Sequence, residues 1–426
     1  MTFEVISEDV QYVHYKRRWY GVVIWLLMNL MTSWGWLTFT TIITASADFY
    51  SVSENAVNNF SIIYMACLVA FSPVVIWMMH RTGFRFTFLF GAAGLSVGSW
   101  LRYAGARTTG PSYALTIVGQ VIMGMAGAVP ISLPSHYTNL WFSGNSRIAA
   151  NAIMSLSNPT GGAVAQLIAP IVVKTKQDIP TLMLYISLIA MSALSILVPA
   201  KPPTPPCMPS EEEHIHPKTA LMMLAKNVKF WLFFIPFTIF IGFFNAISSL
   251  LTQIMSPYGV SSDTSGYLGA AFIGVGLVTA AIATPVIDKF HAQLLSMKVA
   301  APIIGICYLT FIWIPGQPII AAYIVLGAIG GASFTLLPVT LEWLAKETDP
   351  VSPEVSSVLS WMVGQLLGIV FTIIMQNLKA YGDPSVPNGD MKRALIFEGV
   401  IAIACSVLPL FDWFVRKRDV LDTQFV

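Results

Sequence analysis

The chain carries little charge for its length. Only 10% of its 426 residues are Asp, Glu, Lys or Arg, whereas a soluble domain carries about 25%. Hydrophobic residues make up 55% of the chain, and the mean hydropathy is +0.70. This composition excludes a soluble globular enzyme. The net charge is only +2 and the basic residues are scattered, which argues against nucleic-acid binding.

The residue patterns of catalytic and metal sites are also lacking. The four cysteines lie far apart with no CxxC pair, and no phosphate loop or nucleophile–base arrangement occurs. His214-x-His216 could bind a metal and His136-Tyr137 could offer axial ligands to haem, but a flexible acidic linker explains the first pair better, and ordinary packing at a membrane edge explains the second better. We therefore expect no enzyme, no resident metal and no cofactor.

The chain contains long apolar segments with few charged residues. About twelve of them are long enough to span a bilayer, and most charged residues lie between them. The sequence therefore predicts an all-α membrane protein with twelve transmembrane helices, at 20–46, 58–80, 85–106, 112–139, 147–173, 180–199, 230–256, 264–287, 294–314, 318–344, 354–379 and 393–415.

One long polar connection, 200–229, divides these spans into two sets of six. Five prolines fall within Lys201–Pro209, so this segment cannot be helical throughout, and we expect a mobile linker. The predicted organisation is a tail at 1–19, a first half at 20–199, the linker at 200–229, a second half at 230–415 and a tail at 416–426.

The distribution of basic residues predicts the orientation. Sixteen of the 23 lysines and arginines fall in connections on the side of the N-terminus, and seven, Arg102 among them, on the other side. The positive-inside rule then places both termini and the linker in the cytoplasm. No cleavable signal pattern precedes the first span, which we expect to act as a signal anchor. Both the plasma membrane and a vacuole- or lysosome-like endomembrane fit.

The two halves resemble each other at matching spans. Leu156-Ser157 with Gly161 in the fifth span corresponds to Leu359-Ser360 with Gly364 in the eleventh. Such a parallel repeat predicts the major facilitator fold, with two pseudo-symmetric six-helix halves and a solute site near mid-bilayer between them.

Aromatic and amide side chains inside the spans are the candidates for that site. Trp34 and Trp36 lie near the middle of the first span, and only one of them can face a cavity, where its ring could attract an organic cation. Gln365 shares a helix face with Trp361 in the eleventh span. Packing and interhelical hydrogen bonding are the alternative roles for such residues.

Two further amides, Gln120 and Asn158, are candidates on the same grounds and carry the same alternative. Asn158 begins the run Asn158-Pro159-Thr160-Gly161-Gly162, for which we predict a helix break beside a cavity.

The loop after the second span contains Arg81-x-Gly83-x-Arg85. Major facilitators commonly carry a charged latch at this place, although His80 stands here where an acid is usual. A plain basic turn is the alternative, and we expect Arg81, Gly83 and Arg85 to act on a gate.

Acidic residues are scarce inside the spans. Glu342, Glu398 and Asp412 all fall toward span ends, so proton coupling through a central carboxylate is poorly supported. Facilitated diffusion fits better.

The chain resembles the feline leukaemia virus subgroup C receptor (FLVCR) family of major facilitators from Tyr15 to the twelfth span. The matching segments are Tyr15-Lys16-Arg17-Arg18-Trp19, Trp36, Phe49-Tyr50-x-Val52-Ser53, Tyr64-Met65, Arg81-x-Gly83-x-Arg85, Gly119-Gln120, Leu133-Pro134-Ser135, Trp141-Phe142, Asn158, Ser249-Leu250-Leu251-x-Gln253 and Gln365-x-x-Gly368-Ile369-x-Phe371-Thr372.

This resemblance implies transport of choline or ethanolamine, or export of haem. It also implies a pocket in which Trp36, Phe244 and Gln365 occupy three of five positions. The other two positions differ: Gly127 stands where the family has Gln, and Asn245 where it has Tyr. We expect Gly127 to enlarge the cavity and Asn245 to replace an aromatic wall by an amide.

We thus predict a monomeric transporter in the lipid bilayer that moves a small organic solute by alternating access. The alternatives are a haem or porphyrin exporter, a proton-coupled metabolite or drug antiporter, and a membrane receptor that no longer transports.

Overall fold

The computed structural model describes residues 18–107, 110–142, 144–195, 217–348, 351, 353–380 and 387–412. Within these ranges the chain is helical and forms no β-strand. Nine of the described helices are long and apolar enough to cross a bilayer. The other three predicted spans coincide with α4, which carries Arg102 inside its length, with α7, which begins with polar residues, and with α8, of which 17 residues are described.

The first half consists of eight α-helices. They are α1 (Arg18–Thr41), α2 (Ile43–Tyr50), α3 (Glu54–Thr82), α4 (Phe84–Arg107), α5 (Tyr113–Ser132), α6 (Pro134–Trp141), α7 (Gly144–Val172) and α8 (Ile179–Ser195), with the 3-10 turn η1 (Lys176–Asp178) before α8.

The second half begins with a short helix and continues with six long ones. They are α9 (Pro217–Lys226), α10 (Val228–Met255), α11 (Ser262–Lys289), α12 (Gln293–Phe311), α13 (Ile319–Glu347), α14 (Pro353–Asn377) and α15 (Lys392–Ser406), with the 3-10 turns η2 (Ser256–Tyr258) and η3 (Leu408–Phe411).

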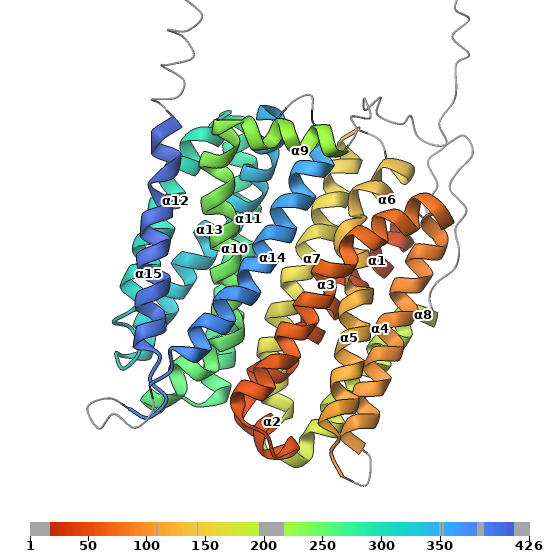
Figure 1. Cartoon of the computed structure of the whole chain (residues 1–426), viewed down its shortest axis with the longest axis vertical. Coiled ribbons are helices and arrows are strands. Elements are labelled where there is room, and N and C mark those ends of the chain that lie inside the picture. Colours follow the sequence, from red (N-terminus) through yellow and green to blue (C-terminus); the bar gives the residue numbers. More distant parts are fainter. Residues whose placement is uncertain are drawn as a thin grey trace, which may run out of the picture.

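The helices of the two halves pair in the same way. In the first half α1 packs on α7, α3 on α5 and α4 on α8; in the second, α10 packs on α14, α11 on α13 and α12 on α15. Figure 1 shows the halves side by side, the first in red to yellow and the second in green to blue. The predicted architecture of two repeated halves is therefore confirmed.

The halves meet along α7 and α11, α3 and α14, and α1 and α10. The face of the molecule that carries α6 and α9 is called the linker face here, and the opposite face the α2 face (Figure 1). Each half has its own hydrophobic core. The contact between the halves is therefore an interface between two separately packed units.

Two predicted spans are interrupted. The first is divided at Ile42 into α1 and α2, and the fourth at Leu133 into α5 and α6. Pro134 explains the second break, because proline at the first position of a helix has no N–H to donate to the preceding turn.

The helix break predicted at Asn158–Gly162 is wrong. The α7 helix runs through this segment with Pro159 inside it. A membrane helix tolerates one missing backbone hydrogen bond when its neighbours pack closely. Gly161 allows that approach, because a Cβ there would collide with the backbone carbonyl of Leu30 on α1.

Part of the predicted linker 200–229 is helical. Residues 200–216 lie outside the described ranges, but Pro217–Lys226 forms α9, whose Ala220 and Leu224 are buried in the core of the second half.

We expect Gly161→Ala to destabilise the protein by about 1–3 kcal/mol, the usual cost of overpacking, because the added methyl group would push α7 away from α1. The matched control is Gly327→Ala, since a Cβ at Gly327 meets only ordinary contacts with Val275. Thermal unfolding of purified protein in detergent measures both variants. A Tm for Gly161→Ala equal to that of Gly327→Ala would show that the approach at Leu30 is not tight.

Candidate functional site

Two of the predicted binding amides are bonded to each other at the boundary between the halves. Asn245 on α10 donates its Nδ2 hydrogen to Oε1 of Gln365 on α14 over 2.9 Å. Gly368 lies three residues beyond Gln365 on the same helix face, and a Cβ there would contact both Asn245 and Met65 of α3. The amide pair therefore lies where the second half meets α3 of the first.

The structure distinguishes the two tryptophans of the first span. Trp34 is buried in a core cluster of the first half. Trp36 is only half-buried, its carbonyl accepts a 2.8 Å hydrogen bond from Ser61, and its indole N–H meets no acceptor in the described ranges. Trp36 is thus the more exposed of the two, while the indole N–H of Trp34 likewise meets no acceptor in the described ranges.

Phe244 and Trp361 contribute half-buried rings from the second half. The Phe244 ring centroid lies 4.9 Å from that of Phe272 and 5.2 Å, edge to face, from that of Phe334. Trp361 precedes Gln365 by one helical turn. Within the described part of the chain no ring contact joins Trp36 to Phe244, so these two walls belong to different halves and are not in contact.

The remaining two candidate amides bond inside the first half. Gln120 is fully buried and donates to the carbonyl oxygens of Gly35 on α1, at 3.2 Å, and of Phe60 on α3, at 3.1 Å. Asn158 on α7 donates to the carbonyl of Asn29 on α1 over 3.4 Å. Both side chains occupy the interhelical role that was the alternative from sequence.

The expectation for Gly127 is wrong. A Cβ on Gly127 would lie 2.5 Å from the hydroxyl oxygen of Tyr64 and 3.0 Å from the methyl group of Thr32. These side chains fill the space that the missing side chain leaves. The glycine lets Tyr64 pack closely and does not enlarge a cavity.

A polar network joins the halves on the α2 face. Asn58 of α3 donates to Gln376 at 3.0 Å and accepts from Gln253 at 2.8 Å, while Lys379 donates to Gln253 at 3.1 Å and to Glu54 at 2.6 Å. Glu54 and Asn58 belong to the first half, and the other three to the second. These five residues are called the α2-face bridge below.

Two weaker contacts add to the closure of this face. Thr252 donates to the carbonyl of Thr41 at 3.3 Å. Lys174 and Asp263 form a 2.6 Å ion pair with side chains 54% and 40% exposed, and such surface pairs stabilise by about 0–1 kcal/mol. The hydrogen bonds seen between described residues of the two halves thus lie on the α2 face.

A second seam, between α7 and α11, is closely packed, and the Lys174–Asp263 pair lies at its α2-face end. A Cβ on Gly269 would overlap the carboxamide of Gln166, and a Cβ on Gly266 would collide with the Gln166 carbonyl and meet Pro170 at 2.7 Å. The two backbones therefore approach as closely as their atoms allow.

The predicted gating residues lie at the other end of the molecule. Gly83 forms the turn between α3 and α4 with φ of +85°, a conformation that favours glycine. Arg81 and Arg85 are exposed, and the Arg81 guanidinium lies 5.7 Å from the centroid of the Trp77 ring. Neither arginine has an acidic partner among the described residues, so this loop does not latch the halves in this structure.

The pair His136-Tyr137, which sequence left open as a haem-ligand pair, packs in an aromatic cluster on the linker face. The Tyr137 hydroxyl donates to the carbonyl of Arg18 at 2.8 Å, and its ring stacks on Trp25 and Phe84. The His136 ring lies 5.6 Å from that of Phe84. Tyr137 is thus engaged in packing.

The comparisons with known proteins agree with this geometry. The profile of the Major Facilitator Superfamily matches residues 25–373. The chain belongs to this superfamily. It is therefore a membrane transporter of small solutes, with the two-half fold through which such carriers alternate access.

The relatives of this major facilitator are FLVCR-related, as the sequence predicts. It is 27% identical over 415 residues to "Solute carrier family 49 member A3" of Danio rerio, covering 93% of this chain and 87% of that protein. It is 26% identical over 421 residues to "Choline/ethanolamine transporter FLVCR1" of Mus musculus, covering 91% and 74%. The crystal structure of a D-xylose–proton symporter matches with a TM-score of 0.69 at 12% identity, covering 92% and 97%, which shows the common fold.

Sequence reasoning missed a buried arginine in this facilitator. Arg102, expected in a connection, lies inside α4 and is 1% exposed. Its Nη1 hydrogen points to the sulfur of Met123 at 3.2 Å and its guanidinium lies 4.8 Å from the centroid of the Phe39 ring. Its Nε and Nη2 atoms meet no acceptor in the described ranges. The charge count along the chain could not reveal this, because Arg102 lies close to a span end.

Glu398, which the sequence places toward the end of the twelfth span, is more deeply buried than expected. It is fully buried in α15, and neither carboxyl oxygen is bonded to a described residue. The helix α15 packs mainly on α12, and also on α10 and α14 within the second half. Burial therefore does not bring Glu398 to the solute site.

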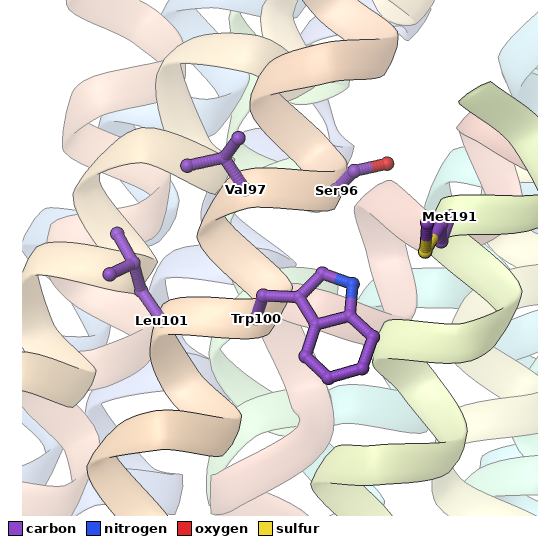
Figure 2. A pocket seen from close by; sticks show the side chains of 5 residues that line it. All are labelled: Ser96, Val97, Trp100, Leu101 and Met191. Atoms are coloured by element: carbon purple, nitrogen blue, oxygen red, sulfur yellow. The ribbon is translucent and has the colours of Figure 1, made fainter. Parts of the chain in front are cut away.

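A groove on the first half lies apart from that site. It has a volume of about 340 Å³ and lies between α4 and α8, lined by Ser96, Val97, Trp100, Leu101 and Met191 (Figure 2). The Ser96 hydroxyl is bonded to the Ala190 carbonyl at 2.8 Å, so the groove is apolar. Figure 1 places α4 and α8 at the edge of the molecule away from the second half.

We expect loss of the Lys379 charge to open the α2 face. Lys379→Met leaves Glu54 unpaired in the bridge, whereas the matched control Lys174→Met removes only an exposed pair. Each 1.4 kcal/mol lost from the closed state raises the open population about tenfold. The readout is the alkylation rate of a Met65→Cys reporter, buried behind the bridge, in a background without the native cysteines. Equal rates in both variants would show that the bridge does not hold the face closed.

We expect Arg102→Met to leave the protein as stable as wild type or more stable, because it removes a buried charge while keeping an unbranched side chain. Arg102→Ala should lose about 2–5 kcal/mol through the cavity it creates. The Tm values of the purified variants decide the point. If Arg102→Met unfolds as early as Arg102→Ala, the guanidinium itself stabilises the half.

Proposed function

We propose that this facilitator carries a small amino alcohol of the choline or ethanolamine class across the membrane by facilitated diffusion. Trp36, Phe244, Asn245 and Gln365 would bind the solute at the boundary between the halves, and the linker face would face the cytoplasm. The relatives named as choline/ethanolamine transporters support the solute class.

The hydrogen bond between Asn245 and Gln365 carries the proposal. It fixes two uncharged amides where α10 and α14 meet α3. Because Asn245 donates and Gln365 accepts, the Oδ1 acceptor of Asn245 and the Nε2 donor of Gln365 are left for a ligand. One solute hydroxyl can donate to the first and accept from the second.

The aromatic residues supply the part of the proposed site that would bind a cation. The faces of Trp36, Phe244 and Trp361 can attract a cationic ammonium group without a carboxylate, and the four proposed contact residues are uncharged. A solute with an ammonium group at one end and a hydroxyl at the other matches rings on one side and amides on the other.

The placement of the acids supports facilitated diffusion. Glu398 is buried in α15 behind α10 and α12, Glu342 is an exposed partner of Lys346 at 2.7 Å, and Asp412 pairs with Lys298 at 3.0 Å. None of the three lies beside Asn245 or Gln365, so a proton bound by any of them would not be exchanged with the solute.

Uptake of radiolabelled choline and ethanolamine by expressing cells tests the proposal. Loss of a desolvated cation–π contact costs about 2 kcal/mol, so we expect Trp36→Ala to weaken apparent affinity about thirtyfold and Trp36→Phe to retain much of it. Gln365→Ala, which removes one hydrogen bond worth about 1 kcal/mol, should weaken it about fivefold. Trp313→Ala, at an exposed tryptophan beyond α12, is the matched control.

Surface expression is measured in parallel, and uptake is repeated with and without an imposed pH gradient. Uptake that persists in Trp36→Ala at normal expression would place the solute elsewhere. Uptake that follows the gradient would contradict facilitated diffusion and favour the proton-coupled alternative.

A further inference from the structure

Two neighbouring serines of α10 are buried without a hydrogen-bond partner. Ser248 and Ser249 are 3% and 2% exposed, and neither hydroxyl is bonded to a described residue. A serine inside a helix can donate to the carbonyl four residues back. Ser72, Ser99 and Ser360 do so in this structure, over 2.7–2.8 Å. Because a buried hydroxyl without a partner costs free energy, the two serines of α10 call for an explanation.

Ser249 lies midway between the proposed solute site and the contacts that close the α2 face. It is four residues from Asn245 on one side and four from Gln253 on the other, so the three side chains follow one line along α10. Asn245 is bonded to Gln365 in the amide pair, and Gln253 is bonded to Asn58 in the α2-face bridge. The unpaired hydroxyl thus separates the two sets of contacts.

Ser248 occupies the same place in a second line along α10. It is four residues from Phe244 and four from Thr252. The Phe244 ring belongs to the proposed solute site, and Thr252 donates to the Thr41 carbonyl of the first half at 3.3 Å. Both lines therefore begin at a proposed solute contact, end at a contact between the halves, and have an unpaired hydroxyl in the middle.

The helix α3 faces this part of α10 from the first half. Its Asn58 is bonded to Gln253, and its Met65 lies beside Gly368 together with Asn245. The two contacts are seven residues apart on α3 and eight residues apart on α10. At 1.5 Å per residue these distances are about 10 and 12 Å, so the two helices stay in register between the contacts. The two serines therefore lie at the level of the α3 segment between Asn58 and Met65.

A hydrogen bond brings the backbone of Trp36 to the same level. Ser61, which lies within that α3 segment, donates to the Trp36 carbonyl at 2.8 Å. The Trp36 ring is half-buried, and its indole N–H has no acceptor among the described residues. The boundary thus has a tryptophan on the first half and two hydroxyls on the second, one helical turn nearer the α2 face than Asn245.

We propose that the hydroxyls of Ser248 and Ser249 form a second station for the solute, which it occupies between the α2-face bridge and the amide pair when that face opens. A hydroxyl both donates and accepts, so a solute hydroxyl can bond either serine and then pass to Oδ1 of Asn245, one turn deeper. In this structure the bridge closes the α2 face above the serines. The inference rests on the proposed amino-alcohol solute.

A labelling experiment tests the position of the serines without any solute. Ser248→Cys and Ser249→Cys are introduced into the full chain, with its four native cysteines replaced, and reconstituted in vesicles. An impermeant methanethiosulfonate is applied to each side, and Lys174→Cys, exposed on the α2 face, identifies that side. Ile247→Cys is the matched control, because Ile247 is buried in the core of the second half.

Both serine positions should be labelled from the side that labels Lys174→Cys, and several-fold faster than Ile247→Cys, because the carrier opens that face in its cycle. Labelling no faster than at Ile247→Cys would overturn the proposal by placing the hydroxyls inside the packed half. Labelling from the opposite side alone would also overturn it, because the station would then lie on the linker side of the amide pair.

A second experiment compares choline with ethyltrimethylammonium, which keeps the cationic group and lacks the hydroxyl. In the double variant Ser248→Ala with Ser249→Ala, choline uptake at low concentration should fall about fivefold at equal surface expression, because one hydrogen bond is lost during entry. Ethyltrimethylammonium should inhibit the remaining uptake as potently as in wild type. Ser72→Ala, which removes a buried hydroxyl bonded within its own helix, should change neither value.

The outcomes separate the station from the proposed function. An equal loss of potency for ethyltrimethylammonium in the double variant would overturn the station, because the serines would then act through packing. Unchanged choline uptake in the double variant, with normal wild-type uptake, would overturn the station and leave the proposed function standing. Absence of choline and ethanolamine uptake in wild type would overturn both.

Discussion

The conformation of this carrier depends on the buried polar contacts that join its halves on the α2 face. An amide or ammonium group that leaves water must find a partner in the protein, and the five residues of the α2-face bridge supply partners to one another across the boundary. The bridge is complete only when α3, α10 and α14 come together. The close packing of α3 against α14 also places Met65 beside Gly368 and Asn245, next to the amide pair. The proposed solute site and the closure of the α2 face therefore share one set of helices.

Different kinds of side-chain contact hold the two faces of the molecule together. Polar side chains hold the α2 face together, so its contacts are exchangeable with water when the halves separate. On the linker face the first half carries the aromatic cluster of Trp25, Phe84 and Tyr137, which keeps the ends of α1, α4 and α6 as one unit. A cluster of stacked rings within one half can move as a rigid body. This division suits a transporter whose halves move and whose interiors do not.

The sequence was a good guide to what depends on local composition. The all-helical membrane architecture and the repeat between the halves require no knowledge of tertiary packing, and the major facilitator fold confirms both. The proline-rich divide lies outside the described residues and stays a prediction. The properties of Asn158, Gly127 and Arg102 depend on neighbours far along the chain. Whether Pro159 breaks a helix depends on how close α1 approaches at Gly161, and whether Gly127 leaves a hole depends on Tyr64. The choice of Trp36 over Trp34 likewise needs the partner helices, because periodicity shows only that the two differ in direction.

The tight seam between α7 and α11 has a mechanical consequence. With Gln166 lying over Gly266 and Gly269, the two backbones cannot approach further. The bridge at α3 and α14, in contrast, consists of contacts that can be exchanged one by one. A body held stiffly along one edge and loosely along the other turns about the stiff edge. If the halves rotate about the α7–α11 seam, a small angle there produces a larger displacement at α3 and α14, on the opposite edge of the boundary.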